Sequence, residues 1–384
     1  MPWIPTLLAT IPLVIWIYLF FARGQFWQLQ EDNSEPESLH RWPRVVALVP
    51  ARNEAAGISQ AVSSLARQDY PGEFSVIVVD DHSDDGTAEL VLKAAEELGA
   101  AGKIVVHAAS AIPSGWTGKV WAMNEGVRAA ADQQPDFFWF TDADIVHAPD
   151  TLRRLASRAE KDSLDLVSLM VLLQARTFPE RLLIPPFLYF FLMLYPPRWI
   201  ADPKARTAGA AGGCVLLRRS ALERAGGLKA IRGEVIDDCS LARVVKRSRG
   251  KIWMGLTRAS VSLRSYGSFA EIRDLIVRTA FTQLRYSFVL LLGTLAALFV
   301  TYVLPVFSFL SGEDPAWFLA ATAICLMAVS FGVTVRFYNL PFMWALTLPF
   351  AAIFYAYATA LSAVRYWLGR GGQWKGRAQA RRNS

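Results

Sequence analysis

Short apolar runs and helical patterns alternate along the first half of the chain. Strands that alternate with helices predict a mostly parallel sheet with helices on both faces. In such α/β folds the ligand lies beyond the carboxyl ends of the strands. We therefore expect functional residues in the loops that follow the strands. The apolar runs are 45–49, 74–79, 103–106, 137–142 and 164–172, and the helical patterns are 55–67, 87–98, 119–131 and 149–161.

Longer apolar segments occupy both ends of the chain. Residues 4–21 contain no charged side chain and approach the length that spans a bilayer. Three further segments near the C-terminus are as long. The pattern predicts an integral membrane protein with an N-terminal anchor at 1–23, a globular domain at 42–287 and a C-terminal membrane region at 288–364. The three C-terminal apolar segments are 288–310, 316–335 and 340–364.

The distribution of charge predicts the partners and the orientation. The formal net charge is +7, and the tail at 365–384 contains six basic residues and no acid. Since the tail accounts for most of the charge, a nucleic-acid partner is not expected, and an anionic membrane surface fits better. Basic residues after the first apolar segment place the globular domain in the cytoplasm, at a bacterial-type inner membrane. These residues are Arg23, Arg41 and Arg44.

The tail and the apolar segments conflict. Three full crossings after a cytoplasmic domain would place the tail outside, whereas its charge favours the inside. One segment is therefore a candidate for a re-entrant or interfacial position. The first candidate is 340–364, which Pro341 and Pro349 interrupt.

Two further apolar stretches lie inside the globular domain. Residues 182–197 are broken by proline pairs, and residues 269–286 contain arginines among apolar side chains. As interfacial helices, both would bring the functional site to the membrane. The alternative is burial under the domain.

Cysteine and histidine give no sign of a metal site. The cysteines lack metal-binding spacing and are predicted to be reduced, so no disulfide-linked partner is expected. The histidines form no ligand pattern and are predicted at the surface or in turns. These residues are Cys214, Cys239 and Cys325, with His40, His82, His107 and His147.

Two carboxylates close the apolar run at 137–142. Asp142 and Asp144 stand one residue apart, so in an extended chain both point to the same side. Buried carboxylates are costly unless they are paired or bind a cation. Their oxygens suit Mg2+ or Mn2+, which commonly bridge to substrate phosphates. A bare D-x-D is a weak signal, and its alternative is a solvated turn.

Polar clusters follow the first two predicted strands. The first is PARNE at 50–54, and the second is DDHSDDGT at 80–87. Helix capping accounts for the later acids of the second cluster, but Asp80 closes a buried strand, and Asp80 or Asp81 is expected to contact a ligand. Because no glycine-rich phosphate loop is present, a metal and side chains such as Lys119 must meet any phosphate charge.

Two further motifs lie downstream. A glycine cluster at 209–213 allows close approach of the backbone to a ligand. Asp237 and Asp238 open a predicted helix, where simple capping is the alternative to a site role.

Taken in order, these motifs resemble glycosyltransferase family 2, the inverting enzymes of the GT-A fold. The resemblance covers residues 44–290 and implies an α/β, Rossmann-like GT-A domain. The WTGK segment and the apolar anchors resemble a narrower group, the hopene-associated glycosyltransferases, which are similar to ceramide glucosyltransferases. The motifs are PARNE at 50–54, VDDHSDDGT at 79–87, GK at 118–119 with AMN at 122–124, D-x-D at 142–144, GG at 212–213 before the arginines at 218–219, GGL at 226–228 and DD at 237–238 in place of the usual ED.

The resemblance implies roles for individual residues. Glu54 and Asp80 would contact the nucleotide base and ribose, Asp142 the ribose and the metal, and Asp144 the metal. Asp238 would be the general base. Their neighbours Pro50, Ala51, Asp81 and Lys119 complete the expected nucleotide-sugar site.

The acceptor motif departs from the family. Membrane-bound members often carry [Q/R]-x-x-R-W, and here TQLRY stands at 282–286. This argues against a processive polymer synthase and leaves Gln283 and Arg285, with Asp237, as residues for the acceptor or the diphosphate. We expect transfer from a nucleotide sugar, with uridine favoured by resemblance, to a lipid hydroxyl in hopanoid or related glycolipid synthesis.

Two alternatives stay open. A polyprenyl-phosphate sugar transferase would need basic residues near Asp238, for which Arg218, Arg219 and Arg243 are available. A catalytically silent nucleotide-binding membrane scaffold would have no need of intact acidic motifs.

Overall fold

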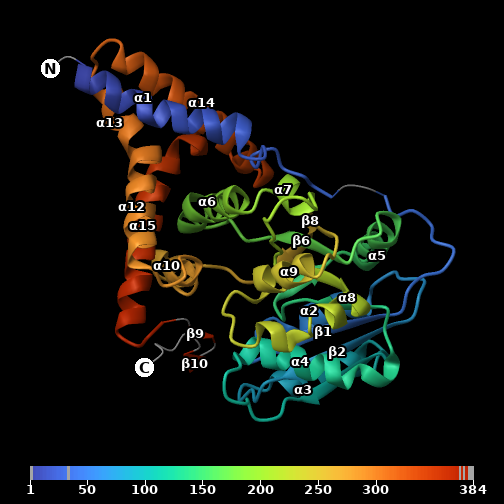
Figure 1. Cartoon of the computed structure of the whole chain (residues 1–384). Coiled ribbons are helices and arrows are strands. Elements are labelled where there is room, and N and C mark those ends of the chain that lie inside the picture. The colour runs from blue at the N-terminus through green and yellow to red at the C-terminus, as the bar shows by residue number, and fades with distance from the viewer. Residues whose placement is uncertain (1–2, 33–34, 372, 375–376, 379–384) are drawn as a thin grey trace.

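A computed structural model describes residues 3–32, 35–371, 373–374 and 377–378. Its centre is an eight-stranded sheet of order β3-β2-β1-β4-β7-β6-β8-β5 (Figure 1). The strands from β3 to β4 are parallel, whereas β7 runs antiparallel to both of its neighbours. The strands are β1 (Val45–Ala51), β2 (Phe74–Asp80), β3 (Ile104–Ala108), β4 (Phe137–Phe140), β5 (Ile145–His147), β6 (Leu166–Leu172), β7 (Val215–Arg218) and β8 (Ile252–Ser262), with a separate pair β9 (Gln373–Trp374) and β10 (Arg377–Ala378).

Helices cover both faces of the sheet because its strands present apolar side chains to both sides. In β1, Val45 and Ala47 pack in one buried cluster, and Val46 and Leu48 pack in the other. One face carries α2 (Ile58–Ala66), α3 (Thr87–Glu97) and α5 (Thr151–Lys161). The other carries α4 (Gly118–Ala129), α6 (Phe178–Leu194), α7 (Pro197–Ala201), α8 (Arg219–Arg224) and α9 (Asp237–Arg247), with the 3-10 turns η2 (Ala131–Gln133) and η3 (Leu228–Ile231) nearby.

The observed sheet confirms the predicted α/β class and adds a detail. The predicted strand 137–142 ends at Phe140, so Asp142 and Asp144 lie in the turn between β4 and β5. The downstream strands make the sheet mixed, although its first half is parallel as expected.

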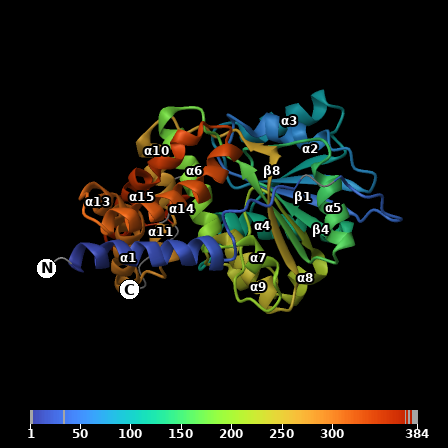
Figure 2. The same ribbon diagram turned by 90° about the horizontal axis from the view of Figure 1, so that it is seen from above.

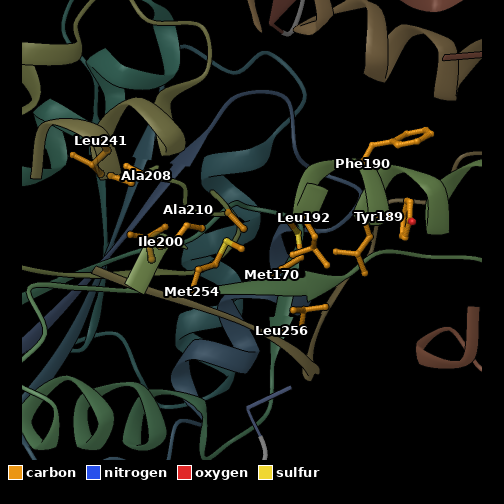
Figure 3. Packing of buried hydrophobic residues seen from close by; sticks show 14 of the residues in the cluster. Met170, Tyr189, Phe190, Leu192, Ile200, Ala208, Ala210, Leu241, Met254 and Leu256 are labelled. Carbon is orange, nitrogen blue, oxygen red and sulfur yellow. The ribbon is translucent and has the colours of Figure 1, made fainter. Parts of the chain in front are cut away.

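Helix α6 connects the sheet domain to the apolar helices. Most of its side chains are buried, including Tyr189, Phe190 and Leu192 (Figure 3). The Tyr189 hydroxyl lies 2.7 Å from the Ser330 hydroxyl in α14, and the Tyr355 hydroxyl of α15 donates to the Leu183 carbonyl. Much of segment 182–197 is therefore covered by protein, and the interfacial position of this segment and of 269–286 stays a prediction.

Four helical segments are long and apolar enough to cross a membrane: Ile4–Ala22, Phe288–Leu310, Ala316–Phe337 and Phe342–Trp367. Figures 1 and 2 show that α1 runs beside α14, whereas α12 runs beside α15. The orientation in a membrane stays a prediction, and part of the predicted tail at 365–384 lies outside the described residues. The elements are α1 (Trp3–Ile17), η1 (Tyr18–Ala22), α10 (Phe269–Val277), α11 (Ala280–Gln283), α12 (Phe288–Leu298), η4 (Phe299–Val303), α13 (Leu304–Leu310), α14 (Ala316–Phe337), η5 (Phe342–Thr347) and α15 (Leu348–Trp367).

Glu180 fixes the start of α6 to the loop after β8. Its carboxylate is fully buried, and it accepts hydrogen bonds from two backbone N–H groups of its own capping box, from the Tyr266 N–H and from the Ser265 hydroxyl. These bonds hold the pKa of Glu180 below its usual value although burial opposes them.

Replacing Glu180→Ala should lower the free energy of unfolding by roughly 3 kcal/mol, because buried donors lose their acceptor. Glu271→Ala is the matched control, since Glu271 accepts the Gly267 N–H in a similar but exposed turn, and its loss should cost no more than about 1 kcal/mol. Denaturant unfolding in detergent measures both. Equal losses would show that burial of the Glu180 bonds is unimportant.

Candidate active site

A small cavity opens at the carboxyl edge of β1 and β4, where the N-terminal ends of α4 and α9 meet the turn after β4. This is the edge at which α/β folds bind ligands. Its lining includes the predicted carboxylates from two distant parts of the chain, 142 and 237–238. The lining residues are Pro50, Lys119, Met123, Phe140, Thr141, Asp142, Gly212, Val215, Asp237, Asp238 and Leu241.

Lys119 joins the two halves of this site. Its ammonium lies 2.7 Å from Asp142 Oδ1 and 3.2 Å from Asp237 Oδ2. Burial alone would lower the pKa of Lys119, but the neighbouring carboxylates raise it above its ordinary value. Lys119 is therefore charged here. To contact a phosphate, as predicted, its ammonium must leave Asp142 or Asp237, or bind the phosphate in addition to them.

Asp238 is held by backbone donors. Its Oδ2 accepts from the Gly212 N–H at 2.9 Å, and its Oδ1 accepts from the Cys239 N–H at 2.7 Å. Burial and the adjacent Asp237 raise the pKa of Asp238 to about 6, although Lys119 and these N–H groups oppose the rise. A carboxylate that ionises near neutral pH suits a general base. The bond to Gly212, outside the helix, goes beyond simple capping of α9.

Asp144 faces a local excess of negative charge. Burial, Asp142 and Glu54 raise the pKa of Asp144 to about 6, and among the described residues the cation Arg264 opposes this rise. Carboxylate oxygens in such a cluster suit a hard divalent cation, so the donor set fits Mg2+ or Mn2+. Among the described residues no group of three or more His, Cys, Asp or Glu side chains converges on one metal position. A bound metal would therefore need ligands from its substrate.

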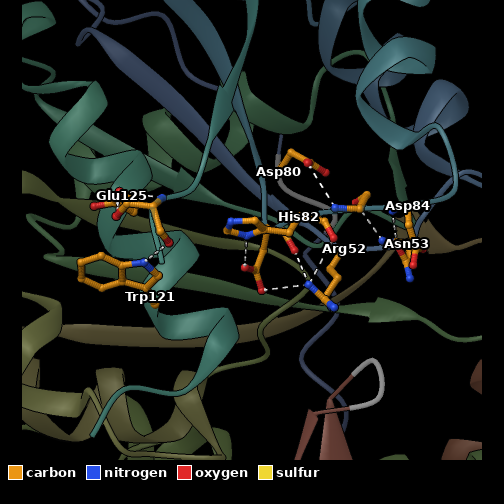
Figure 4. A network of polar contacts seen from close by, with 10 residues as sticks. Arg52, Asn53, Asp80, His82, Asp84, Trp121 and Glu125 are labelled. Atoms are coloured by element: carbon orange, nitrogen blue, oxygen red, sulfur yellow. Dashed lines mark hydrogen bonds and ion pairs between the residues drawn. The ribbon is translucent and has the colours of Figure 1, made fainter. Parts of the chain in front are cut away.

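Asp80 and Asp81 differ, although they are neighbours in sequence. Asp80 Oδ2 accepts from the Ser83 N–H at 3.2 Å, while its Oδ1 is buried without a hydrogen-bond partner from the described residues. Asp81 is fully buried and pairs with Arg52 and His82 (Figure 4). The geometry offers Asp80 to a ligand, whereas Asp81 holds the loop.

The remaining predicted residues lie around this centre. Pro50 lines the cavity, and Ala51 pairs in register with Asp80. The Glu54 N–H donates to the Thr87 hydroxyl at 2.9 Å, which ties the first polar cluster to the second. These contacts position the first cluster beside the end of β2.

The predicted acceptor residues Gln283 and Arg285 lie in different surroundings. Gln283 exchanges hydrogen bonds of 2.7 and 3.0 Å with the Tyr195 hydroxyl, at the end of α6 that faces Cys239. Arg285 is exposed, in a left-handed turn with φ 52°, and none of the contacts recorded for the described part of the chain joins it to the site carboxylates. Of the two predicted acceptor residues, Gln283 therefore lies near Asp238, through its contact with Tyr195.

A buried series of hydrogen bonds behind the D-x-D turn was not predicted from the sequence. His147, predicted at the surface or in a turn, is 3% exposed, and burial lowers its pKa to about 3. Its ring lies 2.8 Å from both Thr141 Oγ1 and Ser260 Oγ, and the Thr141 hydroxyl donates to the Gly213 carbonyl. That prediction was wrong because the pairing of β5 with β8 encloses the ring.

The protons of this chain can be assigned. When the Thr141 hydroxyl donates its proton to the Gly213 carbonyl, its oxygen accepts from the neutral His147, which then donates from Nε2. Its Nδ1 then accepts from Ser260. These hydrogen bonds connect the turn that carries Asp142 to the glycine loop, in which the N–H of the preceding residue, Gly212, holds Asp238.

Thr141→Val should lower the free energy of unfolding by about 2 kcal/mol, since it leaves the His147 N–H and the Gly213 carbonyl unpaired. Thr141→Val with His147→Phe should cost less than the sum of the single changes. Thr151→Val is the matched control and should be nearly neutral, because the buried Thr151 hydroxyl has no partner among the described residues. Additive losses in denaturant unfolding would contradict the assignment.

Comparisons with known proteins agree with this geometry. The family described as glycosyl transferase family 2 matches residues 46–226, which hold every strand from β1 to β7 and the D-x-D turn. A mannosyltransferase from Pyrobaculum calidifontis, solved in complex with GDP-Man and Mn2+, shares the fold with a TM-score of 0.56 at 21% identity, over 93% of this chain and 99% of that one.

Two characterised relatives are similar in sequence. An N-acetylglucosaminyltransferase of Mesorhizobium japonicum is 29% identical over 201 residues, which are 50% of this chain and 43% of that protein. A beta-monoglucosyldiacylglycerol synthase of Synechocystis is 36% identical over 115 residues, which are 30% of this chain and 22% of that protein. The chain thus spans less than half the length of these relatives. Residues 46–226 of this chain thus match the family described as glycosyl transferase family 2.

Proposed function

We propose that the chain is a membrane-bound, metal-dependent inverting glycosyltransferase that moves a sugar from a nucleotide sugar to a lipid hydroxyl. The observation that carries this proposal is the placement of Asp238 across one cavity from the D-x-D turn, with Lys119 between them. Such a cavity offers a base on one side and a site for a diphosphate on the other.

The residues divide the chemistry between them. Asp238 takes the proton of the acceptor hydroxyl as its oxygen bonds to the anomeric carbon, and the bond from that carbon to the diphosphate oxygen breaks on the opposite face. Asp80 and Glu54 hold the nucleoside, and Lys119 meets the charge that develops on the leaving diphosphate. A divalent cation held by Asp142 and Asp144, when bound, supplies further neutralisation of that charge.

The lipid acceptor is supported by the surroundings of the site. Tyr195 and Gln283 place α6 and α11 beside Asp238, and both helices pack against the apolar helices. The Synechocystis relative is named for a glycolipid product. Hopanoid glycolipid synthesis and a UDP-sugar donor rest on the family resemblance alone.

The alternative of a polyprenyl-phosphate acceptor is weakened, because two of the three arginines that could bind its phosphate are engaged elsewhere. Arg218 pairs with Phe137 in register, so it lies at the opposite edge of the sheet from Asp142, and it bonds Glu160. Arg219 bonds Glu223 in α8. Of the three arginines, Arg243 is left, and it lies within α9 with an exposed side chain.

Purified protein should release nucleoside diphosphate from a nucleotide sugar only with Mg2+ or Mn2+ and a lipid acceptor. A panel of UDP- and GDP-sugars against hopanoid, diacylglycerol and sphingolipid extracts identifies the pair. Asp238→Asn should lower the rate about 10²–10⁴-fold because the general base is lost. The exposed control Asp132→Asn should be unchanged. Folded protein that binds nucleotide yet releases none with any pair would favour the silent scaffold.

The rate should also report the ionisation of Asp238. Since its pKa is raised to about 6, the base is charged above that value and protonated below it, so kcat/KM should fall as pH drops through about 6. Saturating metal keeps Asp144, which ionises in the same range, out of the profile. Lys119→Gln should move the midpoint upward, because Lys119 lowers the pKa of Asp238. A midpoint near 4, or one that Lys119→Gln leaves in place, would contradict Asp238 as the base.

A further inference from the structure

Helix α15 contacts the sheet domain and its appended helices from one end to the other. Trp344, in the turn just before α15, lies 5.8 Å from the ring of Phe178 at the start of α6. Near the middle, the Tyr355 hydroxyl donates to the Leu183 carbonyl. At the far end, the Arg365 guanidinium lies 2.9 Å from Asp274 of α10.

Helix α10 runs along this contact. The rings of Phe269 and Phe354 lie 6.1 Å apart near the first residues of α10, and the Ser362 hydroxyl donates to the Val277 carbonyl at its last residue. The Ser362 oxygen also accepts from the Phe281 N–H. A helix of about 30 Å that crosses a bilayer would carry one end away from the domain, and α15 does not.

The other apolar helices do have such an end. Ala9 of α1 packs with Ala316 and Ala320 of α14 in a small cluster that, among the described residues, contains only side chains of the apolar helices. The opposite end of α14 returns to the domain, where the Arg258 guanidinium of β8 lies 4.8 Å from the ring of Phe337. The chain therefore enters η5 and α15 already on the side of the domain.

The outer face of α15 is apolar and exposed. At helical spacing, Phe350, Ile353, Tyr357, Val364 and Trp367 are each between 41% and 69% exposed. The inner face is buried and rich in alanine. Exposure of such an apolar stripe to water along a whole helix is unfavourable, whereas contact with acyl chains at the membrane interface would bury it.

We propose that α15 does not cross the membrane but enters and leaves on the side that holds the sheet domain, with its exposed stripe in lipid. The crossings are then α1, α14 and the part of Phe288–Leu310 that continues past α15 through η4 and α13, since α12 packs along α15. Arg370 follows the stripe and then lies level with anionic headgroups. This arrangement starts the basic tail on the side of the membrane that holds the sheet domain, and it removes the conflict between the charge of the tail and three full crossings.

The test is the labelling of single cysteines by a membrane-impermeant maleimide in sealed vesicles of both orientations. The full chain carries Cys325→Ala, because Cys325 is the exposed native thiol while Cys214 and Cys239 are buried. Glu97→Cys marks the sheet domain, Glu313→Cys marks the turn between α13 and α14, and Arg370→Cys reports the tail. All three replaced side chains are exposed, so folding should be retained.

The proposal expects Arg370→Cys to be labelled in the same vesicles as Glu97→Cys, with Glu313→Cys labelled only in vesicles of the opposite orientation. Labelling of Arg370→Cys together with Glu313→Cys would overturn it, and so would a thiol at 370 that reacts only after detergent is added. A reporter domain fused after residue 371 gives an independent readout of the same side. The outcome does not depend on sugar transfer, so it separates this proposal from the proposed function.

Discussion

The site depends on the enclosure of several carboxylates in a space that contains one lysine. Asp142, Asp237 and Asp238 all interact with Lys119, and Asp144 lies beyond its reach beside Asp142 and Glu54. Like charges at such separations and out of water disfavour full ionisation, and the raised pKa values of Asp144 and Asp238 express that cost. This repulsion between carboxylates would be reduced by a cation bound to Asp144 or by a proton taken up by Asp238.

The fold supports this arrangement from behind and from the side. Behind the D-x-D turn, hydrogen bonds among Ser260, His147, Thr141 and Gly213 connect the turn that carries Asp142 to the glycine loop that holds Asp238. At the side, Glu180 ties α6 to the loop after β8, so Arg264 stays near Asp144. Helix α6 in turn bonds α14 and α15 through Tyr189 and Leu183, so the sheet domain is held against the apolar helices.

The sequence was sufficient where a signal is local. Alternating apolar runs predicted the α/β fold, and the family resemblance carried by the short acidic motifs implied roles for residues 142 and 238 in one site, whose cavity both of them line. It was insufficient where partners are distant in sequence. The ion pair of Lys119 with Asp237, the burial of His147 and the nearness of Arg264 to Asp144 all depend on strand and loop pairings that no local pattern shows. The predicted strand ended early because Thr141 turns to bond Gly213.

Binding of Mn2+ tests the central claim most directly, by calorimetry or electron paramagnetic resonance with and without UDP or GDP. Two neighbouring carboxylates form an incomplete set of ligands, so a nucleoside diphosphate should strengthen Mn2+ binding by about tenfold or more, and Asp144→Asn should abolish that gain. Equal Mn2+ affinity in the presence and absence of diphosphate, unchanged by Asp144→Asn, would contradict the account.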